Sequence, residues 1–152
     1  MKALFFLEWK ESLLRNTDFS VSVHVRRGDY VSDSSANRVH GVMPVEYYQK
    51  AAETLLANNR TLVFYVFTDD SQWVKDNLCL LGDVVHVSGH DLRDCEELVL
   101  MSLCRHHIVA NSSFSWWGAW LGRDTSGRTI APLKWFQRMS SDHIVPEKWL
   151  RI

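Results

Sequence analysis

The sequence predicts an α/β fold with a doubly wound, mostly parallel sheet. Segments with the composition of strands alternate about five times with segments of helical periodicity. No internal repeat, low-complexity tract or linker interrupts the chain, so we expect one domain over residues 1–152. The residues are 46% hydrophobic and 23% charged, which is typical of a globular domain with a sizeable core.

The N-terminal part predicts a helix followed by a strand. Apolar residues at roughly helical spacing over residues 4–15 indicate a leading helix within residues 1–18. Valines alternate with Ser22 and His24 over residues 19–25, and this period of two predicts a strand. The two polar residues make this strand more two-faced than a central parallel strand should be. We therefore expect it to be an edge strand or to carry part of a site.

The remaining elements alternate along the chain. Polar residues indicate an open loop over residues 31–38, and Pro44 suits the first turn of the next helix. An almost continuous apolar run over residues 61–67 predicts a strand that is covered on both faces. The other predicted strands cover residues 84–87, 107–110 and 129–131. The predicted helices cover residues 44–56, 72–78, 92–105 and the stretch between a turn at 111–113 and Gly122.

Composition and charge exclude several classes of function. A formal net charge of -1 argues against a general nucleic-acid binder, because such proteins carry a cationic surplus. Cys79, Cys95 and Cys104 form no CxxC pair, so they indicate neither a disulfide framework nor a zinc site. Glu8 and Lys10 interrupt the first apolar run before it reaches signal-peptide length, and no stretch approaches the roughly 18 apolar residues of a membrane span. We expect a cytoplasmic protein.

The first candidate site follows the first strand. In α/β sheets, ligands bind at the carboxyl ends of the strands. There the sequence places Arg26 and Arg27, followed by Gly28, which allows close approach of backbone, and Asp29. Guanidinium groups match phosphate oxygens in a bidentate manner, so this segment suits a phosphate. The alternative is an Arg–Asp network that only holds a surface turn, which is the commoner meaning of an arbitrary RRGD.

The second candidate site is the turn at residues 111–113. Here a strand leads directly into a helix, so Ser112, Ser113 and the free N–H groups of the helix start converge. Such a helix start attracts phosphate. The alternative is simple N-capping by Ser112 or Ser113, with the tryptophans that follow packed in the core.

The third candidate is an acidic cluster, Asp94, Glu96 and Glu97, early in the preceding helix. A carboxylate offers two acceptors to the adjacent N1–H and N2–H₂ donors of guanine. The alternative is a general interaction of surface acids with the helix dipole.

Other chemical signals are weaker. The sequence has neither GxGxxG nor GxxxxGK, the usual phosphate-loop motifs. Asp69 and Asp70 follow a strand and would suit Mg²⁺ or Mn²⁺, but N-capping of the next helix is the favoured interpretation. Cys104, His106 and His107 have the side chains of metal ligands, yet they lie at a helix-to-strand junction and lack a fourth partner. We expect them to be structural.

Taken in order, the segments HVRRGDY at residues 24–30, EEL at 96–98 and ANSSFSWWGAWL at 110–121 resemble the α-1,2-fucosyltransferase family. The resemblance covers residues 20–137. It implies a GT-B architecture of two facing Rossmann-like lobes, of which this chain is the C-terminal, GDP-fucose-binding one. The N-terminal acceptor lobe of the family is then missing from this chain, and a separate lobe or a second copy is a possible partner.

The resemblance also implies roles for particular residues. Arg26, Arg27 and Asp29 are the expected catalytic residues, with both arginines on the β-phosphate of the donor. The expected GDP-fucose-binding residues are His24, Arg26, Arg27, Glu97, Ser112, Ser113 and Phe114, where Asp94 or Glu96 are alternatives to Glu97 as the reader of guanine.

The activity implied is inverting transfer of fucose from GDP-fucose to a hydroxyl of a galactose-containing glycan, with O2 of galactose as the expected position. No metal or other cofactor is expected. Three alternatives stay open: a nucleotide-binding lobe without catalysis, a metal-dependent sugar transferase that uses Asp69 and Asp70, and a carbohydrate-binding protein that uses Trp116, Trp117 or Trp120. The last requires rings that face solvent, whereas helical spacing favours their burial.

Overall fold

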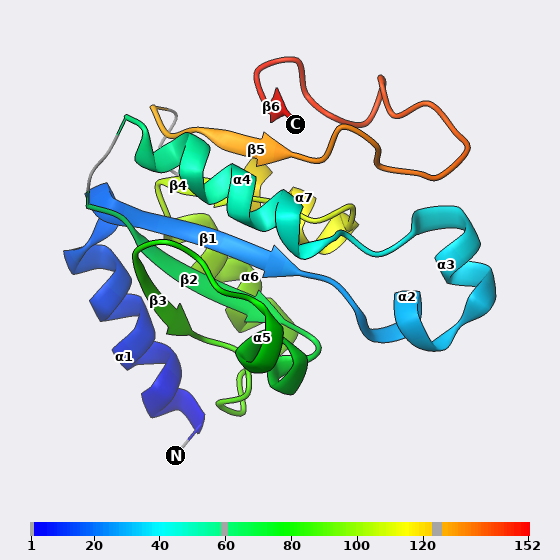
Figure 1. Cartoon of the computed structure of the whole chain (residues 1–152). Coiled ribbons are helices and arrows are strands. Elements are labelled where there is room, and N and C mark those ends of the chain that lie inside the picture. The colour runs from blue at the N-terminus through cyan, green and yellow to red at the C-terminus, as the bar shows by residue number, and fades with distance from the viewer. Residues whose placement is uncertain (1, 59–60, 123–125) are drawn as a thin grey trace.

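Six parallel strands form one open sheet in the order β3-β2-β1-β4-β5-β6 in the computed structural model, which describes residues 2–58, 61–122 and 126–152 (Figure 1). The strands are β1 (Ser20–Val25), β2 (Val63–Thr68), β3 (Asp83–His86), β4 (His106–Ile108), β5 (Thr129–Ala131) and β6 (Leu150–Arg151). The helices are α1 (Lys2–Arg15), α2 (Gly28–Ser32), α3 (Ser34–His40), α4 (Val45–Leu56), α5 (Ser71–Asn77), α6 (Asp94–Leu103) and α7 (Ser113–Trp120), and η1 (Thr17–Phe19) is a 3₁₀ turn. This confirms the predicted doubly wound α/β fold, which is Rossmann-like.

Helices cover both faces of the sheet. On one face the side chains of α4 pack on alternate residues of β1 and β2, and α5 adds Val74 to the same cluster. On the other face α1 and α6 pack on Tyr65 and Phe67, and α7 lies against α6 (Figure 1). Burial on both faces explains why residues 61–67 read as a continuous apolar run.

The first strand lies in the centre of the sheet, so the prediction of an edge strand is wrong. β1 pairs with both β2 and β4, and all six of its residues are buried. Its two polar side chains are accommodated in different ways. Ser22 Oγ shares a hydrogen bond of 2.8 Å with His107 Nδ1 on β4, and the ring of His24 lies 5.3 Å from that of Phe114. His24 is at the carboxyl end of the strand, as the site-bearing alternative requires.

The segment predicted as an open loop is helical. α2 and α3 cover most of residues 28–40, because Asp33 ends one helix and caps the other. Its carboxylate accepts the N–H of Ser35 (2.7 Å), and Asn37 Nδ2 donates to the Tyr30 carbonyl (2.7 Å) across the two helices. Polar residues, which favour loops, here lie on two short exposed helices.

One predicted helix differs in extent, and one strand was not predicted. α6 is shorter than the predicted helix at 92–105, because Glu96 accepts the N–H of Arg93 (2.8 Å) at its start and Cys104 turns extended at its end. The two-residue β6 has too little sequence to show a period. Among the described residues, none of the helices has both the length and the apolar character needed to cross a bilayer.

Candidate functional site

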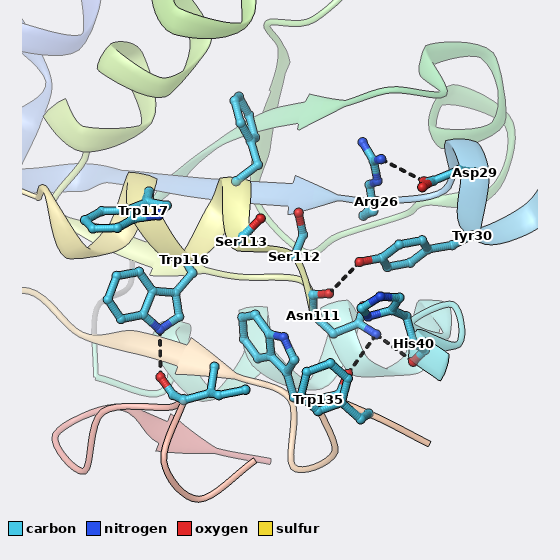
Figure 2. A pocket seen from close by; sticks show the side chains of 13 residues that line it. Arg26, Asp29, Tyr30, His40, Asn111, Ser112, Ser113, Trp116, Trp117 and Trp135 are labelled. Atoms are coloured by element: carbon cyan, nitrogen blue, oxygen red, sulfur yellow. Dashed lines mark hydrogen bonds and ion pairs between the residues drawn. The ribbon is translucent and has the colours of Figure 1, made fainter. Parts of the chain in front are cut away.

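The strand order creates a crevice between β1 and β4. From β1 the chain passes to β2 and β3 on one side, and β4 then returns to the other side of β1. At such a topological switch point, the segments that leave the two central strands diverge and open a binding crevice. In this chain those segments start at Arg26 and at Val109, so the two predicted phosphate-binding segments lie side by side (Figure 2).

One cavity of about 580 Å³ joins these segments. Arg26 and Asp29 line it from the β1 side, and Ser112, Ser113 and Phe114 line it from the start of α7. The structure therefore brings together five of the predicted site residues around one space. The remaining lining residues are Tyr30, His40, Asn111, Trp116, Trp117, Trp135, Phe136 and Ile144.

Asn111 holds the walls of this cavity together. It is fully buried, and its Nδ2 donates to the carbonyls of His40 (2.8 Å), Gly41 (3.2 Å) and Trp135 (3.3 Å). Its own carbonyl accepts the hydroxyl of Tyr30 (3.1 Å), as Figure 2 shows. A single side chain thus links the end of α3, the segment after β5 and the turn after β4.

The start of α7 leaves hydroxyls and N–H groups for a ligand. Ser112 is the N-cap residue, but its side chain makes no capping hydrogen bond, so the expected N-capping by Ser112 is wrong. Ser113 is the first helical residue and is exposed. The hydroxyl of Ser115 faces inward, where it donates to the carbonyls of Ala110 and Ser112 (3.2 Å each). The first N–H groups of α7 and two serine hydroxyls therefore face the cavity region without an intrahelical partner.

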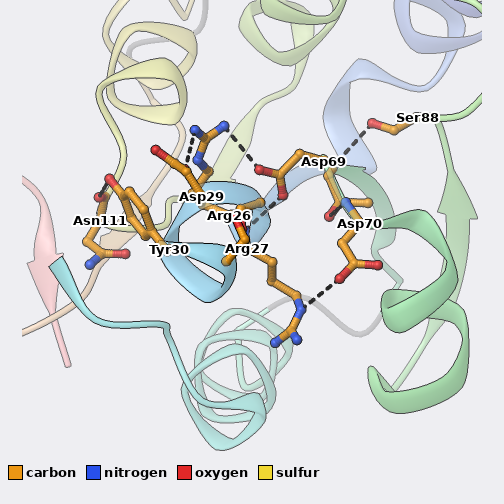
Figure 3. A network of polar contacts seen from close by, with 11 residues as sticks. Arg26, Arg27, Asp29, Tyr30, Asp69, Asp70, Ser88 and Asn111 are labelled. Carbon is orange, nitrogen blue, oxygen red and sulfur yellow. Dashed lines mark hydrogen bonds and ion pairs between the residues drawn. The ribbon is translucent and has the colours of Figure 1, made fainter. Parts of the chain in front are cut away.

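Arg26 lies between two carboxylates. Its Nη2 is 2.7 Å from Asp29 Oδ1, and its Nη1 is 3.1 Å from Asp69 Oδ2 (Figure 3). The guanidinium carbon is 5.4 Å from the centre of the Tyr30 ring, and 33% of the side chain is exposed. These contacts hold the guanidinium in the crevice with N–H donors left over, because the group carries five of them.

Arg27 points the other way, toward α5. Its Nε is 3.1 Å from Asp70 Oδ2, and its guanidinium carbon lies 3.7 Å from the centre of the Trp73 ring. Asp70 also accepts the N–H of Trp73 (3.1 Å), which confirms the predicted helix N-cap. Arg27 does not line the cavity with Ser112. The predicted contact of Arg27 with phosphate would require it to leave these partners.

Asp69 is a site residue that sequence reasoning considered only as a cap or a metal ligand. One carboxylate oxygen accepts the N–H of Arg27 (2.8 Å) and the other pairs with Arg26. A Cβ on Gly28 would collide with Asp69 Oδ2, which accounts for glycine at that position. Asp69 therefore fixes both the path of the chain after β1 and the direction of the Arg26 side chain.

A second, smaller cavity of about 170 Å³ shares Arg26 and Phe114 with the first. Glu97 and Asp94 line it from α6. Its other lining residues are His24, Thr68 and Asp69. Glu96 is directed elsewhere, since its carboxylate accepts the N–H of Arg93 (2.8 Å) at the start of α6. Of the three acids considered for guanine, the structure places two beside the crevice.

Two titratable groups of the smaller cavity, Glu97 and His24, have pKa values far from their usual ones. Burial raises the pKa of Glu97 to about 7, although a hydrogen bond from Ser88 opposes the shift and Asp94 adds to it. Burial and the nearby charge of Arg26 lower the pKa of His24 to about 3, so its imidazole is neutral near pH 7. Perturbed groups in a crevice are typical of functional sites.

The other sequence candidates have structural roles or unexpected exposure. Buried His106 accepts the N–H of Arg128 at Nδ1 (3.0 Å) and His107 pairs with Ser22, as expected of structural residues. The described part of the chain contains no group of three His, Cys, Asp or Glu side chains that could hold a metal ion. The expectation that the helix tryptophans are buried is wrong for Trp117 and Trp120, each 50% exposed.

Comparison with known proteins decides the family. The model of glycosyl transferase family 11 matches residues 5–152. The chain belongs to this family. Both predicted phosphate-binding segments and the acidic start of α6 lie inside the matched region. The residues that line the crevice therefore belong to the part of the chain that matches family 11.

Three relatives from curated proteins show the range of similarity. An alpha-1,2-colitosyltransferase of Escherichia coli is 45% identical over 88% of this chain and 47% of the relative. The O-antigen biosynthesis glycosyltransferase WbnK of Escherichia coli is 32% identical over 95% of this chain and 48% of the relative. Galactoside alpha-(1,2)-fucosyltransferase 1 of Rattus norvegicus is 35% identical over 69% of this chain and 29% of the relative. The chain spans at most about half the length of these relatives.

Sequence reasoning missed much of the larger cavity. His40, Trp135 and Phe136 line it but were not considered, and Tyr30 and Asn111 were noted only as members of the segments at 24–30 and 111–113. Asn111 carried a usable signal, because it directly follows a strand at the carboxyl edge of the sheet. His40, Trp135 and Phe136 gave no comparable signal, since their places depend on contacts between residues far apart in sequence.

Proposed function

We propose that this family 11 glycosyltransferase chain binds GDP-fucose in the switch-point crevice, with the diphosphate between Arg26 and the start of α7. The observation that carries the proposal is the single cavity lined by both Arg26 and the Ser112–Ser113 turn. A guanidinium fork, two hydroxyls and the free N–H groups of a helix start are the donors that a diphosphate requires. No phosphate-loop motif is needed for this arrangement.

We place guanine in the smaller cavity, with Glu97 as its reader. Glu97 and Asp94 line that cavity, which shares Arg26 and Phe114 with the larger one. An ionised carboxylate accepts the two adjacent donors of guanine. Neutral His24, which has its ring against Phe114, supplies one wall.

The reaction we propose is inverting transfer of the sugar to O2 of a galactoside. Negative charge develops on the β-phosphate as GDP leaves, and Arg26 already lies where it can stabilise that charge. Asp29 is its ion-pair partner at the larger cavity. Arg27 could bind phosphate only after leaving Asp70. Its contacts with Asp70 and Trp73 favour a structural role.

A second donor is favoured by one specific observation. The 45% identity with an alpha-1,2-colitosyltransferase exceeds the 35% with the rat fucosyltransferase. Colitose is fucose without the hydroxyl at C3, so the two sugars differ at one position, and we take both to be carried on GDP. The Arg26 and Glu97 assignments hold for either donor.

Calorimetric titration with GDP and a radiolabelled transfer assay to lactose test the proposal. Saturable binding of GDP is the expected result. Transfer from GDP-fucose, from GDP-colitose or from neither then distinguishes the two donors from a binding lobe that needs another lobe for catalysis. A chain that does not bind GDP would refute the assignment of the crevice.

A further inference from the structure

The larger cavity extends well beyond the groups that suit a diphosphate. Arg26, Ser112 and Ser113 form its polar end, whereas much of its remaining lining is aromatic. We call this part the aromatic wall; it consists of Tyr30, His40, Trp116, Trp117, Trp135 and Phe136. A volume of about 580 Å³ is in the range of sites that hold a complete small molecule. The aromatic wall therefore has room for a ligand in addition to phosphate.

Trp117 is the one exposed residue of the aromatic wall. Half of its surface is exposed, while Trp135 is 4% exposed. Trp117 follows Ser113 by four residues on α7, so the two side chains lie on one face of the helix. Its contact with Trp116 is edge-on at 78°, with ring centres 5.0 Å apart. An open indole thus stands one helical turn from the predicted phosphate ligands.

Trp116, which packs against Trp117, is itself held by the C-terminal segment. Its indole N–H donates to the Ile144 carbonyl (2.8 Å), and its ring lies 5.7 Å from that of Trp149. Because Trp116 is anchored to the C-terminal segment, the open ring beside it has a fixed neighbour (Figure 2). A rigid aromatic surface loses little side-chain entropy when a ligand binds to it.

We propose that Trp117 stacks on a pyranose ring of the acceptor glycan, a galactoside. The inference rests on the proposed function, because it takes the diphosphate to lie at Arg26. Transfer requires the acceptor hydroxyl within roughly 3–3.5 Å of the donor carbon, so the acceptor ring must occupy the same cavity as Arg26. The apolar C–H face of galactose suits an indole, while its hydroxyls suit polar groups nearby.

The position of Trp117 favours the acceptor over the donor sugar. The donor sugar is attached to the diphosphate and is a single ring, so it needs no part of the cavity that opens to solvent. An acceptor glycan continues beyond its terminal residue, so it needs a ring that is partly open to solvent, as Trp117 is.

Saturation-transfer NMR of lactose with the GDP-saturated chain tests this subsite. We expect transfer to the galactosyl protons in the native chain, and a signal at least about fivefold weaker in Trp117→Ala, since one stacked ring is removed. Trp117→Phe should keep most of the signal. Trp120→Ala is the matched control, because Trp120 is also 50% exposed on α7 but does not line the cavity.

Several results would overturn the inference. Absence of a lactose signal in the native chain, or an equal signal in Trp117→Ala, would remove the subsite. Equal losses in Trp117→Ala and Trp120→Ala would indicate a broad apolar docking face. Weaker binding of GDP-fucose but not of GDP in Trp117→Ala would assign the ring to the donor sugar. Failure of the proposed function is seen separately, in the GDP titration of the native chain.

Discussion

Replacing Arg26 by alanine should weaken the binding of GDP by about 10²-fold, whereas replacing Arg27 should not. The guanidinium of Arg26 already makes ion pairs with Asp29 and Asp69, and its remaining donors face the cavity at the start of α7. A charge-assisted hydrogen bond contributes about 1.5–3 kcal/mol, so a two-point contact with a phosphate would contribute about 3–4 kcal/mol before solvent screening. A third of the side chain is exposed, which reduces this to about 2–3 kcal/mol. That corresponds to roughly 10²-fold in affinity.

The same substitution at Arg27 affects stability. Its partly exposed pair with Asp70 contributes about 0.5–1 kcal/mol, and its position over Trp73 about 0.5–2 kcal/mol. We expect a Tm lower by about 3–6 °C and a change in GDP affinity of less than about threefold.

Calorimetric titration with GDP, together with thermal unfolding of each variant, measures both effects. Arg26→Lys keeps the charge but loses the fork, so it should recover only part of the affinity. An unchanged Kd in Arg26→Ala would refute the diphosphate assignment. A loss in Arg27→Ala as large as that in Arg26→Ala would show that Arg27 turns toward the ligand.

Three further substitutions or treatments give distinct outcomes. GDP affinity should fall about tenfold per pH unit as the pH drops from about 7 toward 5, because Glu97, whose pKa is raised to about 7, becomes protonated in this range. Glu97→Gln should bind GDP more weakly than the native chain and should lose this pH dependence. Asn111→Ala should lower the free energy of unfolding by about 2–4 kcal/mol in urea titrations, since it leaves three buried carbonyls without their donor, and an effect under 1 kcal/mol would contradict this account. EDTA should leave the binding of GDP unchanged, because Asp69 and Asp70 are already paired with arginines; a loss reversed by added Mn²⁺ would restore the metal-dependent alternative.

The position of the site was predictable because it depends on strand order and on periodicity. The alternation of valines located β1, and the carboxyl-end rule then drew attention to Arg26 and to Ser112. The separate directions of Arg26 and Arg27 were not predictable, since they depend on Asp69 and Asp70 more than forty residues away. A dipeptide of two arginines does not show which one faces the crevice.

Local and distant contacts explain the other differences. The hydrogen bond that turns Glu96 away from the crevice joins residues only three apart, but arginine is not a typical N-cap residue, so the sequence did not indicate it. The exposure of Trp117 was not indicated either, because α7 is apolar on nearly all sides and its period cannot show which side meets solvent. The links of Asn111 span up to 81 residues, and no local pattern records them.

The two acids around Arg26 have a consequence for what can enter the crevice. Asp29 and Asp69 together carry more negative charge than the single guanidinium between them offsets, so this part of the crevice attracts anions only weakly. A diphosphate that binds the remaining donors of Arg26 also meets the charge of these two carboxylates, of which Asp29 is the more exposed. Small inorganic ions would gain little against that repulsion, whereas a nucleotide also gains contacts through its base. Competition by phosphate or sulfate in the surrounding medium is thereby kept low.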